Sequence, residues 1–201
     1  MALTTESLAV GLAGVAARME TAAEELNRLD AQIGDGDLGV TMVRIGRGVN
    51  EVLGDLPDDV GMAFMKCVQA ITKVSGSSYA TLVATALMSA AKVCKGRTEV
   101  PLSEMSALLA GAAEAMKARG KAELGDKTVI DAIDAAAKAV VGLDDGRAIL
   151  AAAGAAVDDV IERMRDRPNR VGRARIWAEK SIGLDDPGMV AFRRMIEGLA
   201  G

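Results

Sequence analysis

The sequence predicts an all-α fold of about eight helices, and two observations support this prediction. Hydrophobic residues make up 50% of the 201 residues but aromatic residues only 2%, so Ala, Leu, Val, Ile and Met must form the core. That composition favours helices over strands. Apolar residues also recur at spacings of three and four, without the convincing alternation that a strand requires. The length suits one domain over residues 1–201, because domains usually contain about 100 to 200 residues.

The first half of the chain contains four segments with helical periodicity. Their apolar series cover 8–26, 42–52, 64–71 and 82–93. The first helix is predicted to end near Asp30, where an Asp/Gly segment follows. Either Asp58 or Asp59 is predicted to cap the third helix, because aspartate side chains accept hydrogen bonds from the first free N–H groups.

The second half contains four further segments of the same kind. Their predicted positions are 105–116, 128–141, 149–164 and 189–199. Asp145 precedes the seventh helix, and Asp186 with Pro187 has the pattern of an N-cap followed by the first helical position. The intervening segment 166–182 is too charged for a buried helix and longer than an ordinary connection. Loops of that length are often functional.

Composition excludes several classes of function. A net charge of −4 with a pI near 5.0 argues against nucleic acid as a partner, which requires clustered Lys and Arg. No apolar run reaches the roughly 20 residues of a membrane span, and the N-terminus lacks the pattern of a signal peptide. We therefore expect a cytoplasmic protein. The absence of histidine excludes a Ser-His-Asp triad and a phosphohistidine step on this chain, while Cys67 and Cys94 are predicted to be buried free thiols.

The segment LDAQIGDGDLGVT (29–41) places three aspartates and three glycines close together. Asp30, Asp35 and Asp37 would repel one another unless they spread into water or bind a cation. Mg²⁺ prefers such oxygen ligands together with phosphates, and glycine lets the backbone fold toward one point. A calcium EF-hand fails on spacing, because Gly46 replaces its twelfth ligand. On these residues alone, an Asp-Gly turn that caps the next helix stays an open interpretation.

Three other loops also permit two interpretations. The segment SGSS (75–78) can offer amides and hydroxyls to an anion, or it can simply cap a helix. GDKT (125–128) can be a helix start capped by Asp126. DDPG (185–188) is fully explained as a cap, and Arg173 can be one of many solvated charges. None of these loops indicates a function by itself.

In their order, these motifs resemble the L subunit, the nucleotide-binding subunit, of dihydroxyacetone kinases. The resemblance rests on LDAQIGDGDLGVTM, SGSS, ARGKAELGDKT and GRARIWAEKSIGLDDPG, and it spans nearly the whole chain. It implies a single-domain antiparallel eight-helix barrel, with ADP or ATP bound in the loops at one end. The helix count from periodicity agrees with that architecture.

The resemblance also implies site residues. In this family the aspartates of the first loop hold two Mg²⁺ ions that bridge the nucleotide phosphates, and here they correspond to Asp30, Asp35 and Asp37. The long segment before Asp186 would act as a lid, with Arg173 facing the phosphates. The implied nucleotide contacts are Leu38, Gly39, Thr41, Ser77, Ser78, Gly120, Val129, Arg173, Asp186, Pro187 and Gly188.

The chain departs from the family pattern at several positions. Leu38 stands where the family commonly has histidine, so only a backbone role is implied there. Tyr79, Ala80 and Thr81 replace a usual Gly-Pro-Leu, and AEKS (178–181) replaces GERS. Phosphate and metal binding are still implied, but the usual substrate, dihydroxyacetone, does not follow from these residues.

A kinase subunit that depends on a partner is the leading functional hypothesis. K subunits of the family bind the ketose through a histidine, which this chain lacks, so a separate K-type subunit would hold the substrate and supply the base. The phosphoryl donor is ATP in some family systems and a phosphotransferase-system protein in others. The main alternative is a nucleotide-loaded regulatory subunit that binds a transcription regulator without turnover. A helical scaffold without nucleotide would require all four loops to match by accident.

Overall fold

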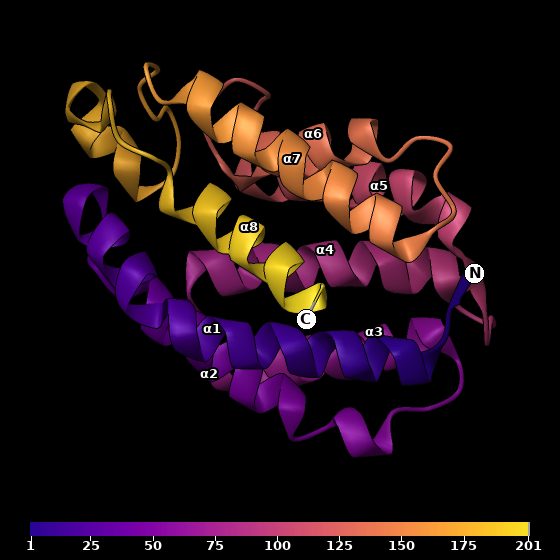
Figure 1. Ribbon diagram of the computed structural model, residues 1–201. Helices are drawn as coiled ribbons and strands as arrows, with labels where there is room; N and C mark the ends of the chain where they lie inside the picture. The colour runs from indigo at the N-terminus through magenta and orange to yellow at the C-terminus, as the bar shows by residue number, and fades with distance from the viewer. Residues whose placement is uncertain (201) are drawn as a thin grey trace.

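The computed structural model describes residues 1–200, and eight α-helices dominate that part of the chain (Figure 1). The α-helices are α1 (Thr5–Ile33), α2 (Leu38–Asn50), α3 (Val60–Val74), α4 (Ser78–Cys94), α5 (Met105–Gly120), α6 (Val129–Ala139), α7 (Gly146–Met164) and α8 (Pro187–Leu199). Short 3-10 helices are η1 (Leu53–Asp55), η2 (Leu102–Glu104) and η3 (Arg173–Ser181). The all-α prediction is confirmed.

One small element was not predicted. The strand β1 (Ala2–Leu3) pairs antiparallel with β2 (Val100–Pro101). The expectation of no strand was therefore wrong at this position. Two residues are too few to show an alternating pattern, and the pairing joins segments about a hundred residues apart, so periodicity could not reveal it.

The helices form a closed antiparallel ring. Each helix packs against the next one in sequence, and α8 packs against α1 (Figure 1). This is the predicted eight-helix barrel. The closing contact is very tight, because a β-carbon on Gly14 of α1 would lie 2.2 Å from the carbonyl oxygen of Gly198 in α8. Glycine at both positions lets the two backbones meet directly.

Aliphatic side chains and sulfur-containing side chains fill the ring, as the composition predicts. Side chains that are almost completely buried include Met19, Leu26, Ile33, Met42, Ile71, Met116, Ile130, Val140 and Met189. The cysteines Cys67 and Cys94 are buried and free, which confirms that prediction. In the part of the chain that the structure describes, no helix is both long enough and apolar enough to cross a membrane.

The ring topology brings the four motifs together. In an antiparallel ring, alternate loops lie at the same end, so the α1–α2, α3–α4, α5–α6 and α7–α8 loops share one end with the N-termini of α2, α4, α6 and α8. This end is at the left of Figure 1. The quoted motifs occupy these four loops and no others.

Some predicted helix boundaries require correction. The first helix continues past Asp30 to Ile33, so this aspartate lies on a helix rather than in a loop. Thr128, and not Asp126, caps α6: its side chain and that of Asp131 form a reciprocal capping box. Asp126 instead accepts a hydrogen bond from the Glu123 N–H at 2.8 Å.

The remaining caps follow the sequence. Asp59 is the residue that caps α3, through the N–H of Met62 at 2.9 Å. Asp145 caps α7, and Asp186 caps α8 with Pro187 in its first turn. The charged segment before α8 is irregular, as predicted, although it contains the 3-10 helix η3.

Candidate functional site

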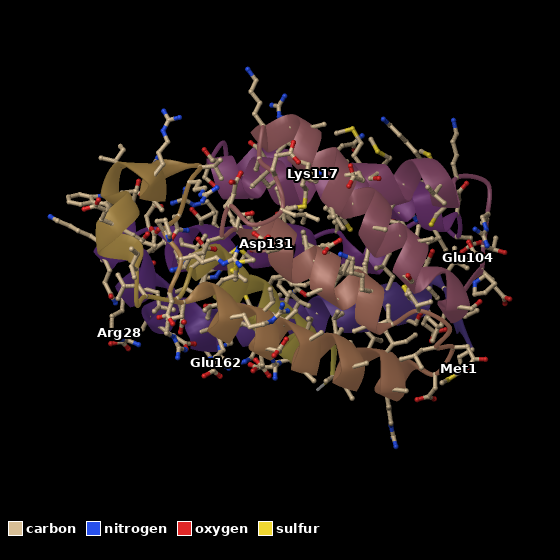
Figure 2. All side chains as sticks on the ribbon, turned by 90° about the horizontal axis from the view of Figure 1, so that it is seen from above. Met1, Arg28, Glu104, Lys117, Asp131 and Glu162 are labelled. Atoms are coloured by element: carbon tan, nitrogen blue, oxygen red, sulfur yellow. The ribbon has the colours of Figure 1, made fainter. Side chains whose placement is uncertain are left out.

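A cavity of about 590 Å³ opens among the four loops at this end of the ring. All the predicted site residues except Gly39 line it. In Figure 2 the segment that contains η3 lies at the same end as Arg28 of α1, and Met1 and Glu104 lie at the opposite end. Residues from the whole length of the chain therefore meet in one cavity, because alternate loops converge there.

Gly39 has a different environment from the other predicted residues. A β-carbon at Gly39 would lie 2.0 Å from the carbonyl oxygen of Ala23, so α2 contacts α1 through this glycine. Gly39 is buried, and it sets how closely the start of α2 approaches α1. Its place in the structure is that of a packing residue next to the cavity rather than of a residue that lines it.

The three aspartates of the first motif converge. Asp30, Asp35 and Asp37 each offer a carboxylate oxygen, and these oxygens lie within 4.8 Å of one another. Asp35 and Asp37 are exposed, while Asp30 on α1 is half-buried. The turn between them requires Gly36, whose φ of 77° is in the left-handed region that favours glycine. Three converging carboxylates are suitable ligands for a hard divalent cation.

Asp30 also shapes the turn. Its Oδ2 atom accepts hydrogen bonds from the N–H groups of Asp37 at 3.0 Å and Leu38 at 3.3 Å. Asn27 on the same helix accepts from the N–H of Val40 at 3.2 Å. The last turns of α1 thus satisfy the free donors at the start of α2, and the carboxylate of Asp37 makes no capping bond of its own.

The other helix starts also face the cavity with defined caps. Ser77 Oγ accepts from the N–H of Ala80 at 3.1 Å, and Thr128 Oγ1 accepts from the N–H of Ile130 at 3.2 Å. Both capping residues line the cavity. The N-terminus of a helix carries a partial positive charge, so several helix starts at one end favour an anion such as phosphate.

Tyr79 connects two of the loops. Its hydroxyl donates a hydrogen bond to the carbonyl of Gly188 at 2.9 Å, and its ring would lie 3.0 Å from a β-carbon at that position. Burial raises the pKa of the Tyr79 hydroxyl, and the nearby Asp186 raises it further, so the phenol stays protonated. The departure from the family pattern at Tyr79 therefore replaces a small residue with a ring that lines the cavity and joins α4 to α8.

The segment 166–182, which we call the lid, supplies a cation to the carboxylates. Arg173 of the lid forms an ion pair with Asp35. Arg119 at the end of α5 also lines the cavity, and this residue was not predicted. Its signal in the sequence is its position directly before Gly120, which was predicted from the family pattern.

A buried polar network beneath the lid was also missed. Asp186 accepts hydrogen bonds from the N–H of Met189 at 2.9 Å and from Nδ2 of Asn169 at 2.8 Å. Burial raises the pKa of Asp186 to about 6, although these hydrogen bonds and the charge of Lys127 oppose the increase. Lys127 and Asn169 are almost completely buried. Lysine and asparagine in polar loops are usually exposed, so no pattern in the sequence predicts this network.

Comparisons with known proteins agree on one family. Residues 32–201 match the DAK2 domain family. The ADP-binding subunit DhaL of the PEP-dependent dihydroxyacetone kinase of Escherichia coli K12 is 29% identical over 188 residues, which cover 90% of this chain and 88% of that protein. The L-erythrulose 1-kinase of Mycolicibacterium smegmatis is 33% identical over 87% of this chain, but over 32% of its own length.

A solved structure confirms the fold. The crystal structure of the dihydroxyacetone kinase of C. freundii in complex with AMP-PNP and Mg²⁺ superposes with a TM-score of 0.75 at 28% sequence identity. The superposition covers 96% of this chain and 33% of that one. The chain thus spans most of the E. coli subunit but about a third of the M. smegmatis and C. freundii enzymes.

Proposed function

The chain belongs to the DAK2 domain family as an L-type subunit of the dihydroxyacetone kinases, and from this premise we propose that it binds ADP or ATP with Mg²⁺ for phosphoryl transfer. The acceptor would be a short-chain ketose held by a separate K-type subunit. The observation that carries the proposal is the convergence of Asp30, Asp35 and Asp37 in a cavity that faces several helix starts. Carboxylates, a cation and phosphate together neutralise charge during phosphoryl transfer.

The residues of the chain divide naturally between the parts of a nucleotide. Asp30, Asp35 and Asp37 would hold Mg²⁺, two ions in this proposal, and the bound metal would neutralise phosphate charge. Ser77, Ser78 and the starts of α4 and α8 would face the phosphates, because helix N-termini favour anions. Gly120 and Val129 line the same cavity and would contact the nucleoside. Arg173 would form a bidentate contact with phosphate oxygens.

The chemical step would exchange one P–O bond for another. The bond between the γ-phosphorus and the oxygen that bridges it to the β-phosphate breaks, and a bond from the ketose hydroxyl oxygen to that phosphorus forms. The hydroxyl proton passes to a base on the K-type subunit, and the bridging oxygen leaves with ADP. This chain contributes position and charge, which are the main sources of catalysis in phosphoryl transfer.

The partner and the donor belong to the same proposal. The chain has no histidine to hold a ketose covalently, so the partner would supply that residue. The E. coli relative is described as PEP-dependent, which supports a phosphotransferase-system donor that recharges bound ADP. Free exchange of ATP is the other route. ADP that survives gel filtration with the purified protein would support the first route, and rapid exchange with added ATP the second.

The ketose would be dihydroxyacetone or a related keto sugar. The E. coli relative is named for dihydroxyacetone and the M. smegmatis relative for L-erythrulose, so substrates of three and four carbons are both represented. The purified chain with each candidate K-type subunit and each ketose distinguishes them by the rate of ketose phosphate formation. Capture of a DNA-binding regulator without turnover would instead support the regulatory alternative.

Calorimetric titration of the nucleotide-stripped protein with ADP, with and without Mg²⁺, tests the proposal. We expect binding that requires Mg²⁺ and that falls at least tenfold in Asp35→Asn, because one of the converging carboxylates is lost. The control Asp144→Asn changes an exposed carboxylate in the α6–α7 loop at the opposite end of the ring. Absence of binding, or an equal effect of both variants, would exclude the proposed site.

A further inference from the structure

Lys127 is a buried lysine whose ammonium group donates hydrogen bonds to backbone carbonyls at the two ends of the lid. The side chain is fully buried, and Nζ donates hydrogen bonds to the carbonyl oxygens of Arg165 at 3.1 Å, Arg167 at 2.8 Å and Ser181 at 2.8 Å. An ammonium group has three N–H donors, so each donor has its own acceptor. Arg165 and Arg167 precede or begin the lid, and Ser181 lies near its end. One charge therefore holds both ends of the lid together.

The backbone at Lys127 adopts a conformation that favours glycine. Its φ of 60° lies in the left-handed region, which costs stability in a residue that has a β-carbon. Glycine would avoid this cost. The three hydrogen bonds of the ammonium offset this cost. Burial lowers the pKa of Lys127, and the negative charges of Asp186 and Asp185 partly counteract that decrease.

Asn169 adds further hydrogen bonds to those of Lys127, and we call the two residues together the lid anchor. Its backbone N–H donates to Ser181 Oγ at 2.8 Å, and Nδ2 donates to the carbonyl of Lys127 at 2.7 Å and to Asp186 Oδ2 at 2.8 Å. The α5–α6 loop, the lid and the start of α8 are thus joined by buried polar contacts. Among residues 1–200, Asn169 Oδ1 is the buried side-chain atom left without a hydrogen-bond partner. The two hydrogen bonds that Nδ2 donates hold the side-chain amide in this position.

We propose that Lys127 is a positioning residue that fixes the base of the lid and thereby sets the rate at which nucleotide leaves the cavity. When the hydrogen bonds of Lys127 hold its two ends together, the lid places Arg173 against Asp35 at the cavity. Without these hydrogen bonds, the two ends of the lid separate more readily and Arg173 spends less time over the site. Lys127 itself does not line the cavity, so its effect on nucleotide acts through the lid. The inference rests on the proposed nucleotide site.

Stopped-flow release of a fluorescent ADP analogue, mant-ADP with Mg²⁺, tests this role in Lys127→Met. We expect release about tenfold faster than in the unmodified protein, with an association rate that is nearly unchanged, because the variant loses the three charge-assisted hydrogen bonds that hold the ends of the lid. The matched control is Lys121→Met, which changes an exposed lysine of the same loop that also has a positive φ, 52°. Equal release rates in the two variants would overturn the proposal.

Limited trypsin digestion provides a second readout that does not need nucleotide. The lid contains trypsin sites at Arg170, Arg173, Arg175 and Lys180. In Lys127→Met we expect cleavage within the lid to accelerate more than cleavage elsewhere in the chain. A variant that only lowers the melting temperature, with unchanged lid cleavage and release, would show a purely structural lysine and overturn the proposal.

The two readouts separate this inference from the proposed function. If the unmodified protein fails to bind mant-ADP, the proposed function fails, and lid cleavage still tests the anchor. If Lys127→Met does not fold, Asn169→Ala can be tested instead. This variant removes hydrogen bonds at the same end of the lid and keeps the ammonium group of Lys127. Normal release and normal lid cleavage in Asn169→Ala would then overturn the role assigned to this anchor.

Discussion

Arg173 of the lid forms an ion pair with Asp35 of the carboxylate cluster, so the two most distant site motifs meet at the mouth of the cavity. The pair places a guanidinium on one of the proposed metal ligands. A cation bound at Asp35 would take over this carboxylate, and Arg173 would then be available to a phosphate. In the proposed complex, metal and phosphate would therefore replace the two halves of this ion pair.

The substitution Arg173→Ala should have opposite effects on the two ligands. We expect Mg²⁺ alone to bind more tightly, because no guanidinium competes for Asp35. Affinity for ADP in saturating Mg²⁺ should fall about tenfold, because a charge-assisted phosphate contact is lost. Separate calorimetric titrations measure both, with Arg175→Ala, an exposed lid arginine, as the control. If the affinities for Mg²⁺ and for ADP changed in the same direction, metal and phosphate would not replace the two halves of this ion pair.

Tyr79→Phe should destabilise the protein modestly. The hydroxyl donates a partly buried hydrogen bond to the carbonyl of Gly188, and loss of such a bond costs about 1 kcal/mol of the free energy of unfolding. Urea denaturation, with an unchanged slope and a lower midpoint, would measure this. An unchanged midpoint would mean that the bond between α4 and α8 contributes nothing net.

Asp186→Asn should change how stability depends on pH. Burial raises the pKa of Asp186 to about 6 from an ordinary value of 3.8, so the folded state favours the protonated carboxyl. This contribution to the free energy of unfolding is fully present below about pH 4 and is lost as the pH rises through 6. The stability of Asp186→Asn relative to the unmodified protein should therefore increase by up to about 3 kcal/mol from pH 4 to 7.5.

Urea denaturation of both proteins across that pH range measures the difference. Lys127 and Tyr79 are coupled electrostatically to Asp186, and both residues are retained in the variant. A poorer hydrogen bond to Asn169 would change the difference in free energy of unfolding by the same amount at every pH. It would therefore not affect how that difference varies with pH. A difference that is constant with pH would contradict the raised pKa.

Gly39→Ala should reduce both stability and Mg²⁺-dependent nucleotide binding. Helix propensity favours alanine by about 1 kcal/mol, but the new β-carbon would lie 2.0 Å from the carbonyl of Ala23 and would force α2 away from α1. Overpacking of this kind costs about 1–3 kcal/mol, and the displaced turn carries Asp35 and Asp37 with it.

Thermal unfolding and ADP calorimetry test this prediction with Gly54→Ala as the control. A β-carbon at Gly54 would meet no described atom within 4 Å, so that variant should keep both properties. Normal binding by a folded Gly39→Ala protein would show that the start of α2 tolerates displacement.

Much of the site can be predicted because local sequence determines local structure. Periodicity locates the helices, and an antiparallel ring of them must bring alternate loops to one end. The Asp/Gly and DDPG motifs therefore had to meet once the ring had formed. Caps close to a helix start, such as Asp145 and Asp186, also depend on neighbouring residues and followed the sequence.

What only the tertiary structure decided are contacts between residues far apart in the chain. Lys127 and Ser181 are 54 positions apart, and Tyr79 and Gly188 are 109 apart, so no local pattern links either pair. Whether a lysine is exposed or buried depends on the acceptors that another segment brings to it. The sequence alone determined the helices, their order and the motifs at one end of the ring. Packing between distant segments decided the lid anchor, the cavity wall at Tyr79 and the pKa of Asp186, because each depends on burial that arises only when the ring closes.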